Sequence, residues 1–264
     1  MKNKIFCYTT LAMAAVLLLS GCGGVGNAPS SGAQSDSADF GSETSVSFSE
    51  ASAGSSGDAS WEIGEIFSRE WANDSGAKWI QYSIPIANTG NDDLFLSNAT
   101  ILLNGAGGQT VATHQYGLFC PQIIAPGETS RLCVLRMLTE AGDVVSLVPL
   151  VSAVKSPYSL VRFDVSVDCL SVDLPIQNYL MVNASGTVKN STGTTFSSTI
   201  HVMILLFDEA GNNIGWLIND FEGLQAGESK EFSANNNLYY SGASEGTIAR
   251  YEVYAFPDAE MNAG

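Results

Sequence analysis

The chain has 264 residues, with 11 basic and 27 acidic side chains and a formal net charge of −16. A chain of this length holds one or two domains. Binding to nucleic acid or to anionic lipid headgroups depends on clustered Lys and Arg. The acidic balance and the lack of any basic cluster therefore exclude nucleic acid as a partner and indicate a surface charged for solubility.

The N-terminus, residues 1–21, has the pattern of an export signal. Two lysines precede an apolar run from Leu11 to Leu19, which is shorter than the roughly 20 residues that a permanent span needs. The run leads into Leu19-Ser20-Gly21-Cys22, which resembles the lipobox of bacterial lipoproteins. The resemblance implies cleavage before Cys22 and diacylglycerol on its thiol. Lipid on Cys22 would anchor the mature protein in the cell membrane, at the extracytoplasmic face.

A low-complexity segment follows the lipobox cysteine. Residues 23–59 are rich in Ser, Gly and Ala and contain scattered acidic residues but no Lys or Arg. Too few apolar groups are present to offset the entropy of ordering the chain. The sequence therefore predicts a disordered tether over residues 22–59.

From Trp61 onward, apolar and polar residues alternate and turn residues recur at short intervals, as in half-buried strands. No long stretch has a helical period. The pattern predicts an all-β chain with three clear apolar strand faces. These faces consist of Ile80, Tyr82, Ile84 and Ile86; of Val182, Ala184, Gly186 and Val188; and of Ile200, Val202, Ile204 and Leu206.

The two halves of this region repeat one another. Asn88-Thr89-Gly90 corresponds to Asn190-Ser191-Thr192-Gly193, and the turn 125–130 corresponds to 225–230. Between them, both halves place a hairpin turn with glycine after a long apolar strand, at 103–105 and at 207–211. The repeat predicts two tandem β-sandwich domains, residues 60–172 and 173–264, divided near Pro175.

The second half resembles the FxLYD domain of bacterial surface lipoproteins. The resemblance covers about residues 175–257, with Ile204 and Phe207 standing where the family has Phe and Tyr. It implies an immunoglobulin-like β-sandwich outside the cell and no particular activity. The residues that carry it are Gly186-Thr187-Val188-Lys189-Asn190, Ile204 to Gly211, Leu224 to Ser229 and the closing strand Arg250 to Phe256.

Three cysteines remain beyond Cys22, and the sequence assigns all of them to the first domain. Cys120 and Cys133 lie symmetrically about Pro126-Gly127, so antiparallel pairing predicts a disulfide between them in an oxidising compartment. A Cys133–Cys169 disulfide is an alternative, because Cys169 shares the inward phase of Phe163, Val165 and Val167. Three buried free thiols are a third alternative.

No constellation in the sequence indicates catalysis, a bound metal or a cofactor. His114 is expected in a loop and His201 on a polar strand face, without a second ligand at metal spacing. Gly242-Ala243-Ser244-Glu245-Gly246 fits G-x-S-x-G, but no histidine follows it to complete a triad. The acidic pairs at 92–93 and 208–209 complete no calcium loop.

We therefore expect a non-catalytic, lipid-anchored surface protein whose sandwiches act as interaction or spacer modules, with an envelope protein or a glycan as partner. The alternative is an accessory lipoprotein that captures a sugar, peptide or metal ion for uptake or sensing. For that role, the tryptophans 61, 71, 79 and 216 could offer a stacking platform, although strand tryptophans are more often part of a core.

Overall fold

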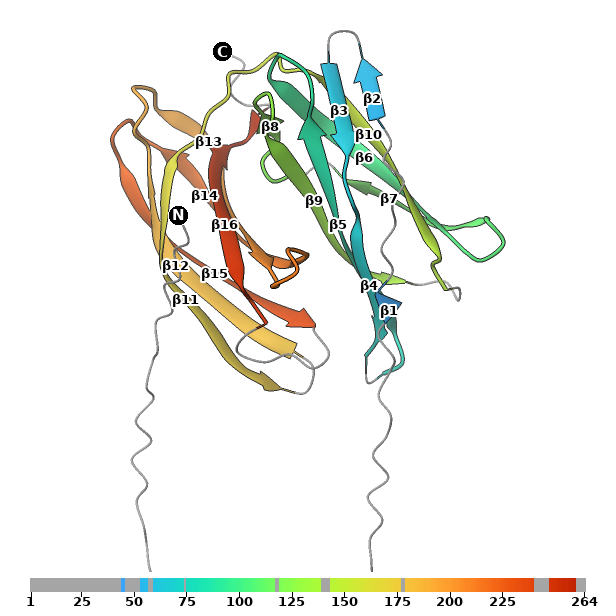
Figure 1. The fold of residues 1–264 in the computed structure, drawn as a ribbon. Helices are drawn as coiled ribbons and strands as arrows, with labels where there is room; N and C mark the ends of the chain where they lie inside the picture. The colour runs from blue at the N-terminus through green and yellow to red at the C-terminus, as the bar shows by residue number, and fades with distance from the viewer. Residues whose placement is uncertain are drawn as a thin grey trace, which may run out of the picture.

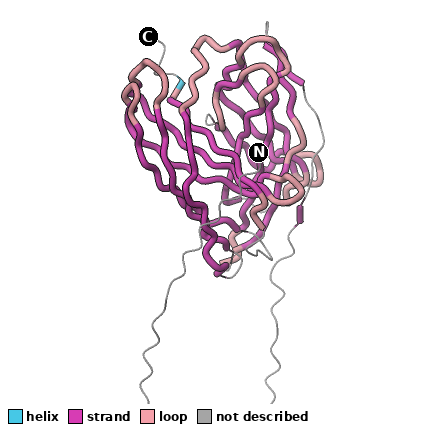
Figure 2. The backbone as a smooth tube through the Cα atoms, turned by 60° about the vertical axis from the view of Figure 1, so that its left-hand side comes forward, coloured by secondary structure: helices cyan, strands magenta, loops and turns pink. Residues whose placement is uncertain are grey.

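A computed structural model gives the fold and describes residues 44–45, 53–56, 59–73, 75–116, 119–138, 143–176, 179–239 and 247–259. The export signal, Cys22 and the segment around Ser244 lie outside the described residues. In the part that the structure describes, strands dominate (Figure 2), and no helix has the length and hydrophobicity needed to cross a bilayer. The all-β prediction is confirmed.

Sandwich 1 consists of two antiparallel sheets, named here after their central strands. The β5 sheet contains β1 (Thr44–Ser45), β4 (Phe67–Ala72), β5 (Lys78–Asn88), β3 (Ala59–Ile63), β2 (Ala53–Ser56) and β9 (Thr129–Leu138). The β6 sheet contains β10 (Ser146–Lys155), β6 (Leu94–Asn104), β7 (Thr110–Tyr116) and β8 (Ile123–Ile124). The predicted face of β5, from Ile80 to Ile86, forms the centre of the core between them.

Sandwich 2 has three strands in each of its two sheets. The β12 sheet contains β11 (Asp164–Ile176), β12 (Tyr179–Lys189) and β15 (Ser229–Tyr239). The β13 sheet contains β14 (Asn213–Leu224), β13 (Phe196–Phe207) and β16 (Arg250–Pro257). Both faces predicted from the alternation in this half, on β12 and on β13, line its core, where Gly186 lies among larger side chains.

The predicted repeat is present in the strand pairing. In sandwich 1, β5 pairs with β9 and β6 pairs with β7 and β10; in sandwich 2, β12 pairs with β15 and β13 pairs with β14 and β16. The hairpins after β6 and β13 also match, because Gly105 and Asp208 each donate a backbone hydrogen bond to the carbonyl four residues on.

One buried asparagine holds the corresponding turns in each sandwich. Asn88 donates to the carbonyls of Asp92 and Ile124, and Asn190 donates to those of Thr194 and Leu224, at 2.8–3.0 Å. The carbonyls of Asn88 and Asn190 accept from Gly127 and Gly227. Both glycines have φ near +80° (79° and 78°), which favours glycine over any residue with a Cβ.

Two of the predicted boundaries are wrong. The division at Asp173 falls inside β11, which pairs with β12 along its length, so the chain passes between the sandwiches in the connection from Lys155 to Asp164. The predicted tether also includes β1 and β2, which extend the β5 sheet by pairing with β4 and β3. Backbone pairing at a sheet edge needs no apolar side chain, so composition did not indicate these strands.

The two sandwiches lie side by side, with the β5 sheet of sandwich 1 facing the β13 sheet of sandwich 2 (Figure 1). Contact between these two sheets buries the strand faces that point away from each core. The molecule is therefore a stack of four sheets, and the contact between its middle sheets is called the joint below.

Candidate functional site: the joint and its cleft

The joint has an apolar centre supplied mainly by the β13 sheet. Alternate residues of β13, Ile200 to Leu206, face the core of sandwich 2, and the residues between them face sandwich 1. β13 is therefore buried on both faces, and its residues from Val202 to Phe207 are apolar on both. The joint cluster consists of Cys120, Met203, Leu205, Phe207 and Phe256, with Cys133, Trp216 and Tyr254 packed against it.

Polar side chains of the β5 sheet cross the joint to backbone carbonyls. The Arg69 Nη2 and the Gln81 Nε2 both donate to the carbonyl oxygen of Ile214 at 2.9 Å. The Arg69 guanidinium also donates twice to Gln81 Oε1, at 2.6 and 3.1 Å, and lies 5.7 Å from the ring centroid of Trp71. Arg69 and Gln81 are both only 3% exposed, so these contacts replace water for groups that would be costly to bury alone.

The connection between the sandwiches is fastened to both of them. Arg162 donates to the carbonyl of Ile123 and lies 3.6 Å from the carboxylate of Glu128, both in sandwich 1. Phe163 donates its backbone N–H to Ala255 in sandwich 2. Burial lowers the pKa of Arg162 from its ordinary value, although the arginine remains charged at physiological pH. A connection held at both ends limits rotation of one sandwich against the other.

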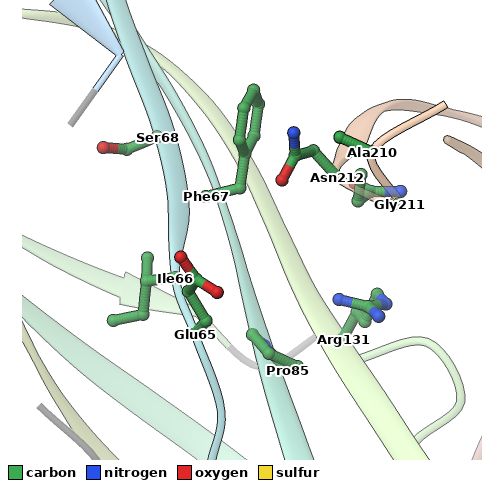
Figure 3. Close-up of a pocket in the computed structure, with 10 residues that line it drawn as sticks. Glu65, Ile66, Phe67, Ser68, Pro85, Arg131, Ala210, Gly211 and Asn212 are labelled. Atoms are coloured by element: carbon green, nitrogen blue, oxygen red, sulfur yellow. The ribbon is translucent and has the colours of Figure 1, made fainter. Parts of the chain in front are cut away.

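A cleft opens at one margin of the joint (Figure 3). It has a volume of about 380 Å³, within the usual range of small-ligand sites. Sandwich 1 contributes the corner before β4, the start of β4, Pro85 and Arg131, and sandwich 2 contributes the β13–β14 hairpin. The lining residues are Glu65, Ile66, Phe67, Ser68, Pro85, Arg131, Ala210, Gly211, Asn212 and Asn213.

The hairpin wall of the cleft is fixed by its own hydrogen bonds. The carboxylate of Asp208 accepts from the backbone N–H of Asn212 at 2.8 Å and from its side-chain amide at 2.9 Å. The amide of Asn213 donates to the carbonyls of Leu206 and Gly215. The predicted acidic pair at 208–209 thus contributes a carboxylate that holds a hairpin.

Cys120 and Cys133 lie together in the joint as free thiols. None of the three cysteines in the described part of the chain forms a disulfide, so neither predicted disulfide is present. The Ala125–Glu128 turn is centred on Pro126-Gly127 as expected, but Cys120 pairs with Arg131 and Cys133 pairs with Ser83, so the two cysteines are not cross-strand partners. Burial raises the pKa of Cys120 well above its ordinary value and that of Cys133 to about 12. Thiols that stay protonated are poor nucleophiles.

Cys169 differs from the sequence expectation in both domain and face. It lies on β11 of sandwich 2, and the register of β11 against β12 shifts between Val167 and Cys169. The extra residue on β11 changes which side chains point inward beyond it. Leu170 therefore enters the core in place of Cys169. A one-residue irregularity of this kind leaves no signal in an alternating pattern.

The two histidines occupy strands. His114 lies on β7, inside a half-buried cluster, where its Nδ1 is 2.9 Å from the hydroxyl of Tyr82. The prediction of a loop at His114 is therefore wrong. Tyr116 and Arg136 complete this cluster, with Arg136 Nε donating to the Tyr116 hydroxyl at 3.1 Å. On β13, His201 lies 2.9 Å from Asp220.

The aromatic and acidic candidates have structural surroundings. Trp61 is part of the core of sandwich 1, Trp71 is buried, and Trp216 packs against the joint cluster. Asp92 forms an ion pair with Lys155 at 2.9 Å. Trp79 is half-buried on β5 and is the cross-strand partner of Trp71 on β4, so these two tryptophans lie together, whereas Trp61 belongs to the core of sandwich 1.

Comparison with known proteins adds no family. No family model and no curated protein matches the chain. A β-glucuronidase structure from Bacteroides uniformis is 15% identical over 61% of this chain and 22% of its own, with a TM-score of 0.20. The tandem CBM22 domains of Xyn10C from Paenibacillus barcinonensis are 12% identical over 85% and 92%, with a TM-score of 0.13. The chain thus spans about a quarter of the glucuronidase chains, and at such TM-scores neither likeness carries a conclusion about function.

Proposed function

We propose that the protein is a non-catalytic, lipid-anchored cell-surface protein whose two sandwiches act together as one interaction or spacer module. The observation that supports this most directly is the joint. Arg69 and Gln81 bond across it to one carbonyl, and an apolar cluster surrounds them. Two sandwiches joined in this way hold a binding surface at a fixed distance from an anchor, which a flexible pair would not.

The anchor can be tested on the full chain by labelling cells with radioactive palmitate. We expect label on the wild-type protein and none on Cys22→Ser, because the thiol is the acceptor that the lipobox resemblance implies. Cys7→Ser is the matched control, since Cys7 lies within the export signal and should leave labelling unchanged. Equal labelling of the Cys22→Ser protein would contradict the anchor.

A second candidate function is capture of a small ligand, and the cleft is the observation that favours it. Its walls come from both sandwiches, and sites of this kind often lie between domains. A thermal-shift screen of the full chain with glycans, peptides and divalent ions would test it. A shift of several degrees with one class supports capture, and no shift with any class leaves the interaction or spacer role.

A further inference from the structure

Arg131 presents a cation to the cleft that no described residue neutralises. Its backbone is fixed by two hydrogen bonds with Cys120, both 2.9 Å long. Its guanidinium lies 5.1 Å from the ring centroid of Phe207, a cation–π contact that holds the group in place. Among the described residues, the Arg131 side chain has no ion pair and no hydrogen bond. Its planar donors are therefore available to a carboxylate, which guanidinium binds in a fork.

Arg250 is a second arginine that contacts the Phe207 ring, and a carboxylate neutralises its charge. Its guanidinium lies 3.7 Å from the Phe207 centroid and pairs with the carboxylate of Glu252. Arg250 does not line the cleft. Two arginines thus share one aromatic ring, but only Arg131 lines the cavity, and among the residues that the structure describes it has no carboxylate partner.

The opposite charge comes from the other side of the cleft. Glu65 is exposed, lies at the corner before β4, and makes no ion pair or hydrogen bond with any described residue. The corner is held by the N–H of Gly64, which donates to the carbonyl of Pro85 at 3.0 Å. Figure 3 shows Glu65 and Arg131 on either side of Pro85. A carboxylate and a guanidinium that face one cavity without pairing can each bind the opposite charge of a ligand.

We propose that the cleft binds a small zwitterionic ligand of amino-acid or short-peptide chemistry, with the ligand carboxylate on Arg131 and its ammonium group on Glu65. The remaining walls agree with this, because Asn212 is fixed by Asp208 and Phe67 supplies an apolar side. The proposal rests on the ligand-capture candidate above and names the chemistry of its ligand.

Isothermal titration of the full chain with L-alanyl-L-alanine is the test. We expect binding, and a loss of at least about tenfold in affinity when the ligand is N-acetylated or when its carboxylate is amidated, because each change removes one charged contact. Maltose, which is neutral, should give no heat. Equal affinity for the capped dipeptides, or binding of maltose alone, would overturn the proposal.

Variants separate binding from stability of the joint. Arg131→Gln and Glu65→Gln should each weaken dipeptide binding by at least about tenfold, and Arg131→Lys by less, because it keeps the charge but loses the fork. Arg250→Gln and Glu62→Gln are the controls: the first removes the other cation from Phe207, and the second removes an exposed acid outside the cleft. Both should bind as the wild type does. Unchanged binding by Arg131→Gln would overturn the proposal.

Failure of this proposal and failure of the anchor are distinguishable. If no dipeptide binds while Cys22 is labelled with palmitate, the ligand assignment is wrong and the lipoprotein proposal stands. If the dipeptide binds while Cys22 is unlabelled, the cleft assignment stands without the anchor.

Discussion

The two sandwiches share the pairing of their central strands and one turn network, yet their equivalent strands β6 and β13 have different surroundings. Asn104 on β6 and Phe207 on β13 both precede the hairpin, after the same register shift. Asn104 is half-buried, whereas Phe207 is fully buried in the joint. The backbone position is the same, so the difference lies in what covers the outer face. Hydrogen-bonded turns preserve the fold, and side chains on one outer face decide how the sandwiches associate.

The cores also differ at equivalent cross-strand pairs. In sandwich 1, Ile84 lies opposite Leu132; in sandwich 2, Gly186 lies opposite Phe232. One large side chain in the second pair occupies space that two medium ones share in the first. The Gly186 position leaves no room for a side chain, because an added Cβ would lie 1.9 Å from the Ser166 carbonyl oxygen.

The sharpest test of the comparison is to truncate the equivalent residues Phe207 and Asn104. Phe207→Ala should lower the free energy of unfolding by about 3–5 kcal/mol, because it leaves a cavity beneath two guanidinium groups. Asn104→Ala should change it by no more than about 0.5 kcal/mol. Urea unfolding of both proteins measures the difference, and equal costs would show that the joint contributes no stability.

The next largest effect is expected from Gly186→Ala. It should destabilise the protein by about 3 kcal/mol, because the new methyl group meets a backbone carbonyl that cannot rotate away. Gly193→Ala, in a turn with open space around it, is the matched control and should change stability little. Thermal unfolding followed by circular dichroism measures both. A neutral Gly186→Ala would show that β11 and β12 separate readily.

The shared turn network predicts similar costs in both sandwiches. Asn88→Ala and Asn190→Ala should each lower stability by about 2 kcal/mol, since each leaves buried carbonyls without a donor. The Asn190 variant should cost slightly more, because the hydroxyl of Thr192 also bonds to its side chain at 2.6 Å. Urea midpoints of the two variants, measured side by side, test this. A large cost at only one site would contradict the structural equivalence of the turns.

The smallest expected effect is a pH dependence confined to sandwich 1, where His114 occupies the place that Leu217 has in sandwich 2. Burial, and to a lesser extent the Arg136 charge, lower the pKa of His114 below its ordinary value. The unfolded chain therefore binds a proton more readily, so stability is complete above the ordinary histidine pKa and declines as pH falls.

His114→Gln removes this titration and keeps an acceptor for Tyr82. Urea midpoints at pH 7.5 and pH 5 should fall less in the variant than in the wild type. Because the pKa of Glu70 is raised by its burial, Glu70 opposes this trend, and only the difference between the two proteins isolates His114. An identical fall in both would contradict the assignment.

Much of the fold could be predicted because it follows from local rules. Alternation located the faces of β5, β12 and β13, and repeated Asn, Gly and Glu residues located the turns. The joint was harder to predict from the sequence, although the sequence contains a signal for it. The unbroken apolar run from Val202 to Phe207 has the composition of a strand buried on both faces.

The sequence contains no comparable signal for the polar residues of the joint and its cleft. Gln81 and Ser83 lie on the opposite face of β5 from Ile80 to Ile86, and both are almost completely buried. Their alternation with Ile80 and Tyr82 is the same as on an exposed strand, and only the approach of sandwich 2 covers them. Arg131 and Glu65 likewise acquire a common cavity only when residues far apart in the sequence meet across the joint.

The joint also determines how a further unit of this kind would have to be added. It brings non-equivalent faces together, since the β5 sheet of one repeat meets the counterpart of the β6 sheet in the next. Contacts of this kind do not close on themselves, and repeated copies would extend into a fibre. On β6, Thr100 and Asn104 stand where β13 has Met203 and Phe207, so the outer face of the β6 sheet lacks two of the apolar side chains that form the joint.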